Sequence, residues 1–183
     1  MPEDDPTIFA KVLEFIYFGT IRYHLDDEFL KSSAGQVTLT DTKQERFCAA
    51  SEGLMRVYQL ANKLCMETLM NAIHDRYRTT HKYFGVSTQD LVNLTEDGCK
   101  DSLLRKFALK QMVHYIRGYG WDHFKSISLS LRTSYMEQDP GNAIELFELF
   151  AKMGAEQKVG NPAGWKDKCQ WHVHIDTPNC DVG

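Results

Sequence analysis

The chain has 183 residues, of which 43% are hydrophobic and 25% charged, and its formal net charge is −4. These totals are typical of one ordinary globular domain or two small ones, and they lack the basic excess that a nucleic-acid-binding surface requires. No apolar run is long enough to span a bilayer, and the acidic start, MPEDDP, is unlike a secretory signal. We therefore expect an intracellular protein, cytoplasmic or nuclear, that binds neither nucleic acid nor a membrane.

The five cysteines are predicted to be free thiols. They are Cys48, Cys65, Cys99, Cys169 and Cys180, an odd number at wide spacings. Such a set does not resemble a disulfide framework, and a reducing compartment keeps thiols reduced.

The first predicted element is an amphipathic helix over residues 5–19. Asp5 can cap its first turn, Pro6 suits the first helical position, and Gly19 can close the helix in a left-handed conformation. One face carries apolar side chains at helical intervals, namely Phe9, Val12, Leu13 and Ile16. A helix with so apolar a face needs a surface to pack against, and almost nothing precedes it in the chain.

A long polar connection and a second helix are expected next. Residues 20–41 are polar, and the alternating VTLT at 37–40 could form one short strand. The helix can begin at the capping-box sequence 42–45, or later at Ser51, because Gly53 weakens the run by about 1 kcal/mol relative to alanine. The sequence leaves both starts open.

This helix and the one after it are expected to form a hairpin. A break near Cys65 and Met66 separates them, and the following helix spans about residues 67–78. Its apolar face consists of Leu69, Ile73 and Tyr77. Two helices joined by so short a link must lie side by side.

After a linker at 79–87, the pattern predicts a short helix and then a longer one. The short helix carries Leu91, Val92 and Leu94 and ends at Asp97–Gly98, and the longer one spans about 101–118. The apolar face of the longer helix consists of Leu104, Phe107, Ala108, Met112 and Ile116.

The remaining residues give a weaker pattern. Residues 121–135 fit both a strand and a helix, and we favour a helix because the neighbouring segments are helical. A last helix is expected from Asp139–Pro140 to about Gly154, with Ile144, Phe147 and Ala151 directed inward. Beyond residue 155 glycine, proline, lysine and asparagine dominate, so an irregular tail is expected. The sequence therefore predicts a mainly α fold of short amphipathic helices.

Two stretches of the sequence resemble the second half of a BTB/POZ domain. FAKVLEFIYFGTI is similar to the central helix of that family, F-x-x-x-L-x-F-I-Y-x-G, with matches at Phe9, Leu13, Phe15, Ile16, Tyr17 and Gly19. VYQLANKLCMETLMNAIHDRYR, residues 57–78, resembles its C-terminal helical hairpin, with matches at Tyr58, Leu60, Ala61, Lys63, Leu64, Met66, Leu69 and Ala72. Asn62 stands where the family often has aspartate. CQWHVH at 169–174 resembles the C-x-Y-H-x-H string of fungal BTB proteins, so the likeness is to the fungal type.

The resemblance implies a division into three parts and a role in protein–protein interaction. Residues 1–78 would be a partial BTB/POZ region, 79–154 a helical extension and 155–183 an irregular tail that contains cysteine and histidine. The strands and the dimerising helix of the family's first half have no counterpart here, so we expect a chain truncated at its N-terminus, or else a non-functional product of a truncated reading frame. The expected function is that of an adaptor or scaffold without enzymatic activity or cofactor.

The same resemblance implies a partner-binding face on the first helix. The residues expected to contact a protein partner are Phe9, Leu13, Tyr17 and Phe18. The partner would be a second copy of the chain or a cullin-type scaffold, which adaptors of this family contact through this helix. The commoner alternative for Tyr17 is that it packs at the end of the helix.

The string with the clearest metal-ligand chemistry lies in the tail and is Cys169-x2-His172-x-His174-x5-Cys180. Thiolate and imidazole ligands at short spacings are typical of tetrahedral zinc sites, and the alternative function is therefore a small zinc-binding or redox protein. In the competing interpretation Trp171 and Val173 pack the tail onto the helices while the histidines face solvent.

A cysteine nucleophile is the weaker candidate. Cys65 and His74 lie on neighbouring parts of the expected hairpin, but no sequence feature indicates a cleft or a lowered thiol pKa. We expect Cys65 to be a buried structural thiol.

Overall fold

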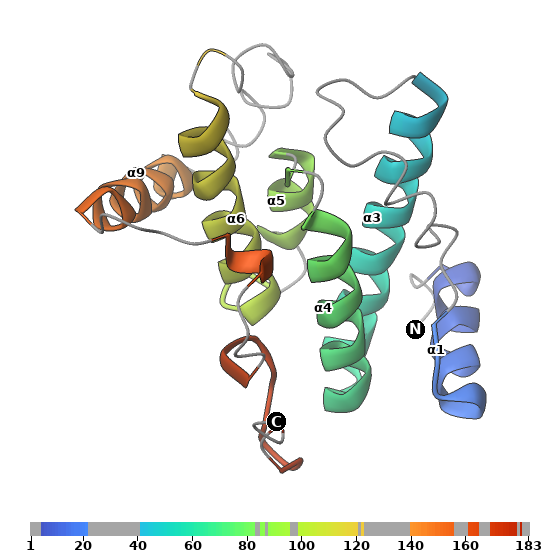
Figure 1. Cartoon of the computed structure of the whole chain (residues 1–183). Helices are drawn as coiled ribbons and strands as arrows, with labels where there is room; N and C mark the ends of the chain where they lie inside the picture. Colours follow the sequence, from blue (N-terminus) through green and yellow to red (C-terminus); the bar gives the residue numbers. More distant parts are fainter. Residues whose placement is uncertain are drawn as a thin grey trace. The chain divides into compact units, whose positions relative to one another are not determined.

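The computed structural model describes ten segments of the chain: residues 5–21, 41–82, 85–86, 88–95, 99–120, 122, 140–155, 161–164, 169–178 and 180. Helices and turns make up these segments, and no strand occurs among them, which confirms the predicted mainly α fold (Figure 1). The strand proposed at 37–40 lies outside the described residues, as does nearly all of the ambiguous segment 121–135. Within the described part of the chain, none of the helices combines the length and hydrophobicity needed to cross a bilayer.

The chain divides into two compact units. The first comprises Met1–Phe84 together with Asp167–Gly183, and the second comprises Gly85–Lys166. The tail thus belongs with the N-terminal helices, although more than eighty residues separate them in sequence. The three-part division expected from the sequence stays a prediction.

The first unit contains the helices α1 (Pro6–Phe18), α3 (Asp41–Lys63) and α4 (Glu67–His81). α3 contacts α1 and also α4, and Figure 1 shows it between them. The core of this unit is built on the α3–α4 hairpin, and its most deeply buried side chains include Leu54, Val57, Tyr58, Ala61, Leu69, Ile73 and Tyr77. The apolar face predicted for α4 is therefore confirmed.

The ends of α1 lie where its sequence predicts. The Asp5 carboxylate accepts a hydrogen bond of 2.8 Å from the backbone N–H of Thr7, and Pro6 opens the helix. Gly19 adopts a φ of 67° and donates its backbone N–H to the carbonyl of Phe15 at 2.8 Å. Glycine is favoured in this left-handed conformation because other residues pay a steric penalty there.

α3 begins early and continues through Gly53, so the later start at Ser51 is wrong. Ser51 is buried within the helix, and its hydroxyl lies 3.3 Å from Nε2 of His81. Burial of the neighbouring Leu54 and Met55 outweighs the cost of about 1 kcal/mol for a glycine in a helix interior.

The hairpin turns at the position that the sequence indicates, and α4 then runs three residues beyond the expected end. Cys65 occupies the turn with a φ of 54°. The extra turn of α4 brings His81 into the core, where its ring lies 4.1 Å from that of Tyr77 and 5.3 Å from that of Phe47. This aromatic packing explains why the segment after residue 78 is helix and not linker.

The second unit contains α5 (Thr88–Thr95), α6 (Leu103–Tyr119), α9 (Pro140–Ala155) and the short 3₁₀ helix η1 (Pro162–Gly164). α6 contacts the three other elements. Ser102 caps α6 by accepting a hydrogen bond from the backbone N–H of Arg105. The predicted apolar residues of α6 are all buried, as are Leu91, Val92 and Leu94 of α5.

The face predicted for α9 is wrong. Ile144 and Phe147 are each 60% exposed, and Ala151 is exposed as well. Asn142 and Leu146 face the core instead. A buried charge on α6 explains this orientation of α9.

Arg105 of α6 is almost completely buried and therefore requires polar partners. Thr95 and Lys100 accept two of its hydrogen bonds. α9 supplies two more partners, because the Arg105 guanidinium donates to Oε2 of Glu145 at 2.7 Å and to Oδ1 of Asn142 at 3.3 Å. These two contacts fix the rotation of α9 about its axis and leave Ile144 outside.

Candidate functional site

Two surfaces of the first unit carry the residues singled out in the sequence. One is a polar stripe along α4, which holds the tail. The other is the outward face of α1. The stripe consists of Glu67, Asn71, His74 and Asp75, which are spaced at helical intervals and so lie along one side of α4.

Asn71 binds the tail through both of its side-chain polar atoms. Its Nδ2 donates to the carbonyl oxygen of Val173 at 2.9 Å, and its Oδ1 accepts from the backbone N–H of Val173 at 2.8 Å. The amide thus satisfies the donor and the acceptor of one residue, as a neighbouring strand would.

Glu67, at the start of α4, binds the next part of the tail. Its carboxylate accepts hydrogen bonds from the backbone N–H groups of Ile175, Asp176 and Thr177 and from the Thr177 hydroxyl. Burial by itself would raise the pKa of Glu67, but these hydrogen bonds to the ionised form outweigh it and lower the pKa below its ordinary value.

His74 fixes the tail at Trp171. Nδ1 of His74 donates a hydrogen bond to the Trp171 carbonyl oxygen, and the two rings meet edge to face with 5.9 Å between their centroids. Both side chains are buried. Burial lowers the pKa of His74 to about 4, so this imidazole is neutral at physiological pH.

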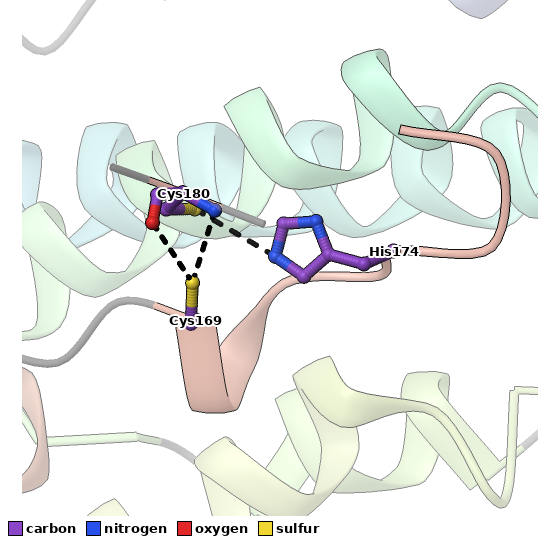
Figure 2. Close-up of side chains that lie close together, drawn as sticks. All are labelled: Cys169, His174 and Cys180. Carbon is purple, nitrogen blue, oxygen red and sulfur yellow. Dashed lines mark hydrogen bonds between the residues drawn. The ribbon is translucent and has the colours of Figure 1, made fainter. Parts of the chain in front are cut away.

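The cysteines and histidines of the tail converge beside this stripe. η2 (Cys169–Trp171) turns the chain, and the ligand atoms of Cys169, His174 and Cys180 all lie within 4.8 Å of one another (Figure 2). Nε2 of His174 is 3.7 Å from Sγ of Cys180, and Cys169 Sγ accepts a hydrogen bond of 3.1 Å from the backbone N–H of Cys180. These three side chains therefore lie close enough together to share one ion.

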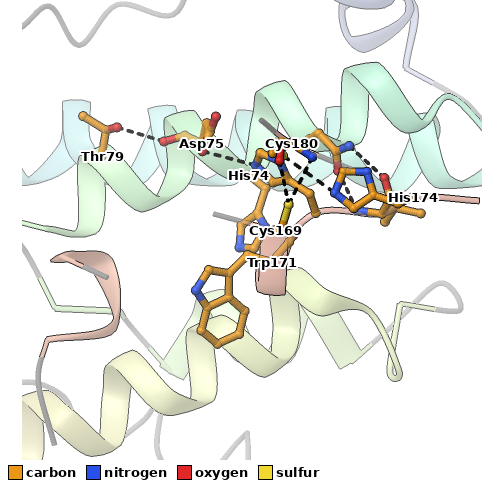
Figure 3. Close-up of polar contacts among 10 residues, drawn as sticks. His74, Asp75, Thr79, Cys169, Trp171, His174 and Cys180 are labelled. Atoms are coloured by element: carbon orange, nitrogen blue, oxygen red, sulfur yellow. Dashed lines mark hydrogen bonds and ion pairs between the residues drawn. The ribbon is translucent and has the colours of Figure 1, made fainter. Parts of the chain in front are cut away.

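His172 joins the cluster to α4. Its Nδ1 lies 2.9 Å from Sγ of Cys180, and its Nε2 lies 3.3 Å from Oδ1 of Asp75, an ion-pair contact without the alignment of a hydrogen bond. Figure 3 labels Asp75 and Cys180, the two residues that His172 joins. Only 9% of the His172 side chain is exposed. The interpretation in which the tail histidines face solvent is wrong, because His172 is enclosed between α4 and Cys180.

Cys180, His172 and Asp75 have the order of a nucleophile, a base and an orienting carboxylate. The electrostatics do not favour that use. Burial raises the pKa of the Cys180 thiol, and the neighbouring Cys169 raises it further. A nucleophilic cysteine needs the opposite shift, because the thiolate is the reactive form.

Cys65 and His74 do not form a site. Cys65 is exposed at the hairpin turn, so its predicted burial is wrong. A tight turn places this side chain outside the α3–α4 packing. His74 is engaged with Trp171 and not with Cys65. None of the five cysteines forms a disulfide.

A pocket of about 250 Å³ occurs in the second unit, between α6 and α9. It is lined by Lys106, Leu109, Lys110, Glu145, Glu148, Leu149 and Lys152. This lining of lysines, glutamates and leucines lacks the histidine or cysteine that acid–base or nucleophilic work at neutral pH commonly uses.

The outward face of α1 is the second candidate surface. Val12 is 1% exposed and packs the helix onto α3, whereas Ile16 is 57% and Tyr17 77% exposed. The other exposed apolar side chains of this face are Phe9, Leu13 and Phe18. The alternative in which Tyr17 packs at the end of the helix is wrong, since 77% of this residue is exposed.

Sequence reasoning found the tail cluster and the α1 face but missed the stripe on α4. Glu67, Asn71 and Asp75 were not singled out, because polar residues on a helix are ordinarily assigned to solvent. The available signal was their spacing on the side of α4 that Leu69, Ile73 and Tyr77 do not occupy. That spacing alone does not reveal a partner about one hundred residues later.

Compared with known proteins, the chain matches no family model, no curated protein and no solved structure. The BTB/POZ resemblance therefore stays an interpretation of the residues.

Proposed function

We propose that this chain is a protein–protein interaction module of the BTB/POZ type and that it self-associates through α1. The observation that carries the proposal is the exposed apolar face of α1 on a helix that is fully capped and anchored by Val12. Apolar patches of this kind on a folded surface mark sites of association. The motif F-x-x-x-L-x-F-I-Y-x-G on the same helix supports the family.

A second copy of the chain is the occupant that best suits this face. The charged residues of α1 are Lys11 and Glu14, and they form an ion pair of 2.8 Å with each other. Two copies related by a two-fold axis bring the same patch together, so a charged patch would meet its own charge. The face of α1 avoids this repulsion because its exposed side chains are uncharged.

A membrane surface suits this helix less well. Helices that lie in the interface of a membrane carry lysine or arginine on their polar face and bind anionic lipid through them. Lys11 is the one basic residue between Pro6 and Phe18, and Glu14 neutralises it. The apolar face is therefore better matched to polypeptide.

An adaptor role is the finer form of the proposal. By the family resemblance, Leu13, Tyr17 and Phe18 would contact a cullin-type scaffold. These residues belong to the face proposed for self-association, so one helix cannot bind both partners at once. An N-terminal cullin domain that competes with self-association, measured by titration calorimetry, would support the adaptor form.

Light scattering coupled to size-exclusion chromatography tests the proposal. We expect a mass that rises from monomer toward dimer as the loading concentration increases from the micromolar range. A monomer at every concentration would contradict self-association. Co-sedimentation with vesicles of anionic and neutral lipid provides the companion measurement, and binding there would favour a membrane surface over polypeptide.

The second candidate function, a small zinc-binding or redox protein, is favoured by the convergence of Cys169, His174 and Cys180. A zinc-binding protein and a redox protein would both use the tail and not α1. The presence or absence of bound metal distinguishes the two.

A further inference from the structure

We propose that Cys169, His172, His174 and Cys180 bind one Zn²⁺ ion, and that this ion locks the tail onto α4. The proposal is independent of the function assigned to α1, because every ligand belongs to the tail and the supporting residue belongs to α4. It rests on four observations: the donor set, the spacing of the donor atoms, a supporting carboxylate and the docked backbone around the cluster.

The donor set selects zinc. Two thiolates and two imidazoles are the ligands of many tetrahedral structural zinc sites, whereas magnesium and calcium prefer oxygen. Four protein ligands also complete the coordination shell and leave no position for substrate or water. The expected role is therefore structural and not catalytic.

The donor atoms of Cys169, His174 and Cys180 all lie within 4.8 Å of one another, close to the spacing that zinc requires, and His172 reaches this group through its contact with Cys180. With Zn–S bonds of about 2.3 Å and Zn–N bonds of about 2.0 Å, the ligand atoms of a tetrahedral site lie roughly 3.3–3.8 Å apart. Nε2 of His174 and Sγ of Cys180 are separated by 3.7 Å. Nδ1 of His172 lies 2.9 Å from the same sulfur, so entry of the ion requires these two atoms to separate by about half an ångström.

Asp75 gives the cluster the support that zinc-bound histidines commonly have. Ligating imidazoles usually donate their second nitrogen to a carboxylate or carbonyl, which fixes the ring and its tautomer. Oδ1 of Asp75 lies 3.3 Å from Nε2 of His172. If the ring turns so that Nε2 donates to Asp75, the lone pair of Nδ1 is left to bind the proposed ion beside Cys180.

The docked backbone explains what the ion achieves. Asn71 and Glu67 already hold Val173 and residues 175–177 on α4, so the ligands of the tail are arranged before the metal arrives. Because Asp75 of α4 contacts His172, zinc binding is expected to add its free energy to the docked state of the tail.

The experiment uses the full-length protein without an affinity tag, purified under reducing conditions. We expect one equivalent of zinc per chain by elemental analysis. Replacement of zinc by Co²⁺ should give the visible absorption of tetrahedral cobalt together with a thiolate-to-metal charge-transfer band. A protein without bound zinc, or a cobalt complex without the thiolate band, would overturn the proposal.

Variants identify the ligands and the supporting carboxylate. Cys180→Ser should lose stoichiometric zinc, whereas Cys65→Ser, which alters an exposed cysteine outside the cluster, should retain it. Asp75→Ala should weaken zinc binding roughly 10- to 100-fold in a competition titration with a chelating dye. Equal zinc affinity in Cys180→Ser and wild type would overturn the assignment.

Two further outcomes, misfolding of Cys180→Ser and a Cys169–Cys180 disulfide, can also be interpreted. If Cys180→Ser does not fold, the cobalt spectrum of the wild type decides, since it reports sulfur ligation without a substitution. A Cys169–Cys180 disulfide that persists in the zinc-supplemented, reduced protein would overturn the metal site and favour the redox alternative.

Discussion

The outward face of α1 and the polar stripe of α4 belong to the same unit but differ in how they are covered. Along α4, the side chains of Glu67, Asn71 and His74 bind the tail backbone through hydrogen bonds. On α1, Ile16 and Tyr17 are more than half exposed. The tail therefore covers the stripe on α4. Among the described residues, none covers most of Ile16 or Tyr17 on α1.

The chain uses the stripe on α4 for its own folding, whereas the outward face of α1 remains available to a partner. Hydrogen bonds to backbone demand a fixed geometry, so the α4 stripe selects one conformation of the tail. Burial of apolar area is non-directional, so the face of α1 can accept any apolar polypeptide of suitable shape. Substitutions on α4 should therefore affect stability, and substitutions on α1 should affect association.

The largest effect on the α4 side is expected from Trp171→Ala. Removal of a buried aromatic side chain typically costs about 3–5 kcal/mol, and here it also removes the ring that packs against His74. Amide hydrogen exchange of residues 171–177 should lose its protection, while the exchange of α6 stays unchanged. Ile175→Ala, at an exposed position, is the control. Undiminished protection in Trp171→Ala would show that the tail is held by other contacts.

A smaller effect is expected from Asn71→Ala. The substitution removes both hydrogen bonds to Val173 and leaves its backbone groups without that partner, which should cost roughly 1–3 kcal/mol of docking free energy. Thr68→Ala, an exposed position on the same helix, is the matched control and should lie close to wild type. Chemical denaturation followed by hydrogen exchange of the tail measures both. Equal stability and equal tail exchange in the two variants would show that Asn71 does not hold the tail.

The pH dependence of docking should be the smallest effect, and Glu67 sets its direction. The pKa of Glu67 in the folded state lies below its ordinary value of 4.5. Its contribution is therefore complete above pH 4.5 and is lost as the pH falls through the folded-state pKa.

Glu67→Gln tests this dependence. The reporter is the fluorescence of Trp171 in a variant whose other tryptophans are replaced by phenylalanine, measured with a chelator present so that metal release does not contribute. The wild type should undock at acidic pH with a transition that Glu67→Gln lacks. Identical acid transitions in both proteins would exclude Glu67 as the titrating group.

Local signals made α1 and the hairpin predictable, while distant polar contacts did not. Asp5, Pro6 and Gly19 act within one turn of the chain, so their effect is visible in the sequence. The orientation of α9 depends instead on Arg105, whose buried charge turns Asn142 and Glu145 inward and leaves the more hydrophobic Ile144 exposed. Hydrophobic periodicity does not register such a contact.

The tail shows the same limit. The spacing of Cys169, His172, His174 and Cys180 indicated a shared site, because the four residue types carry metal-ligand chemistry on their own. The part played by Asp75 could not be inferred, since a lone aspartate on a helix has no distinguishing pattern until the tail lies against it.

The most direct test of the account compares the molecular mass of two lysine variants by light scattering. Ile16→Lys places a charge on the face of α1, and Ile144→Lys places one at a similarly exposed apolar position of the second unit, where 60% of the side chain is exposed. If α1 is the interface, Ile16→Lys should be monomeric and melt as the wild type does, while Ile144→Lys should still dimerise. Retention of the dimer in Ile16→Lys, or its loss in both variants, would contradict association through α1.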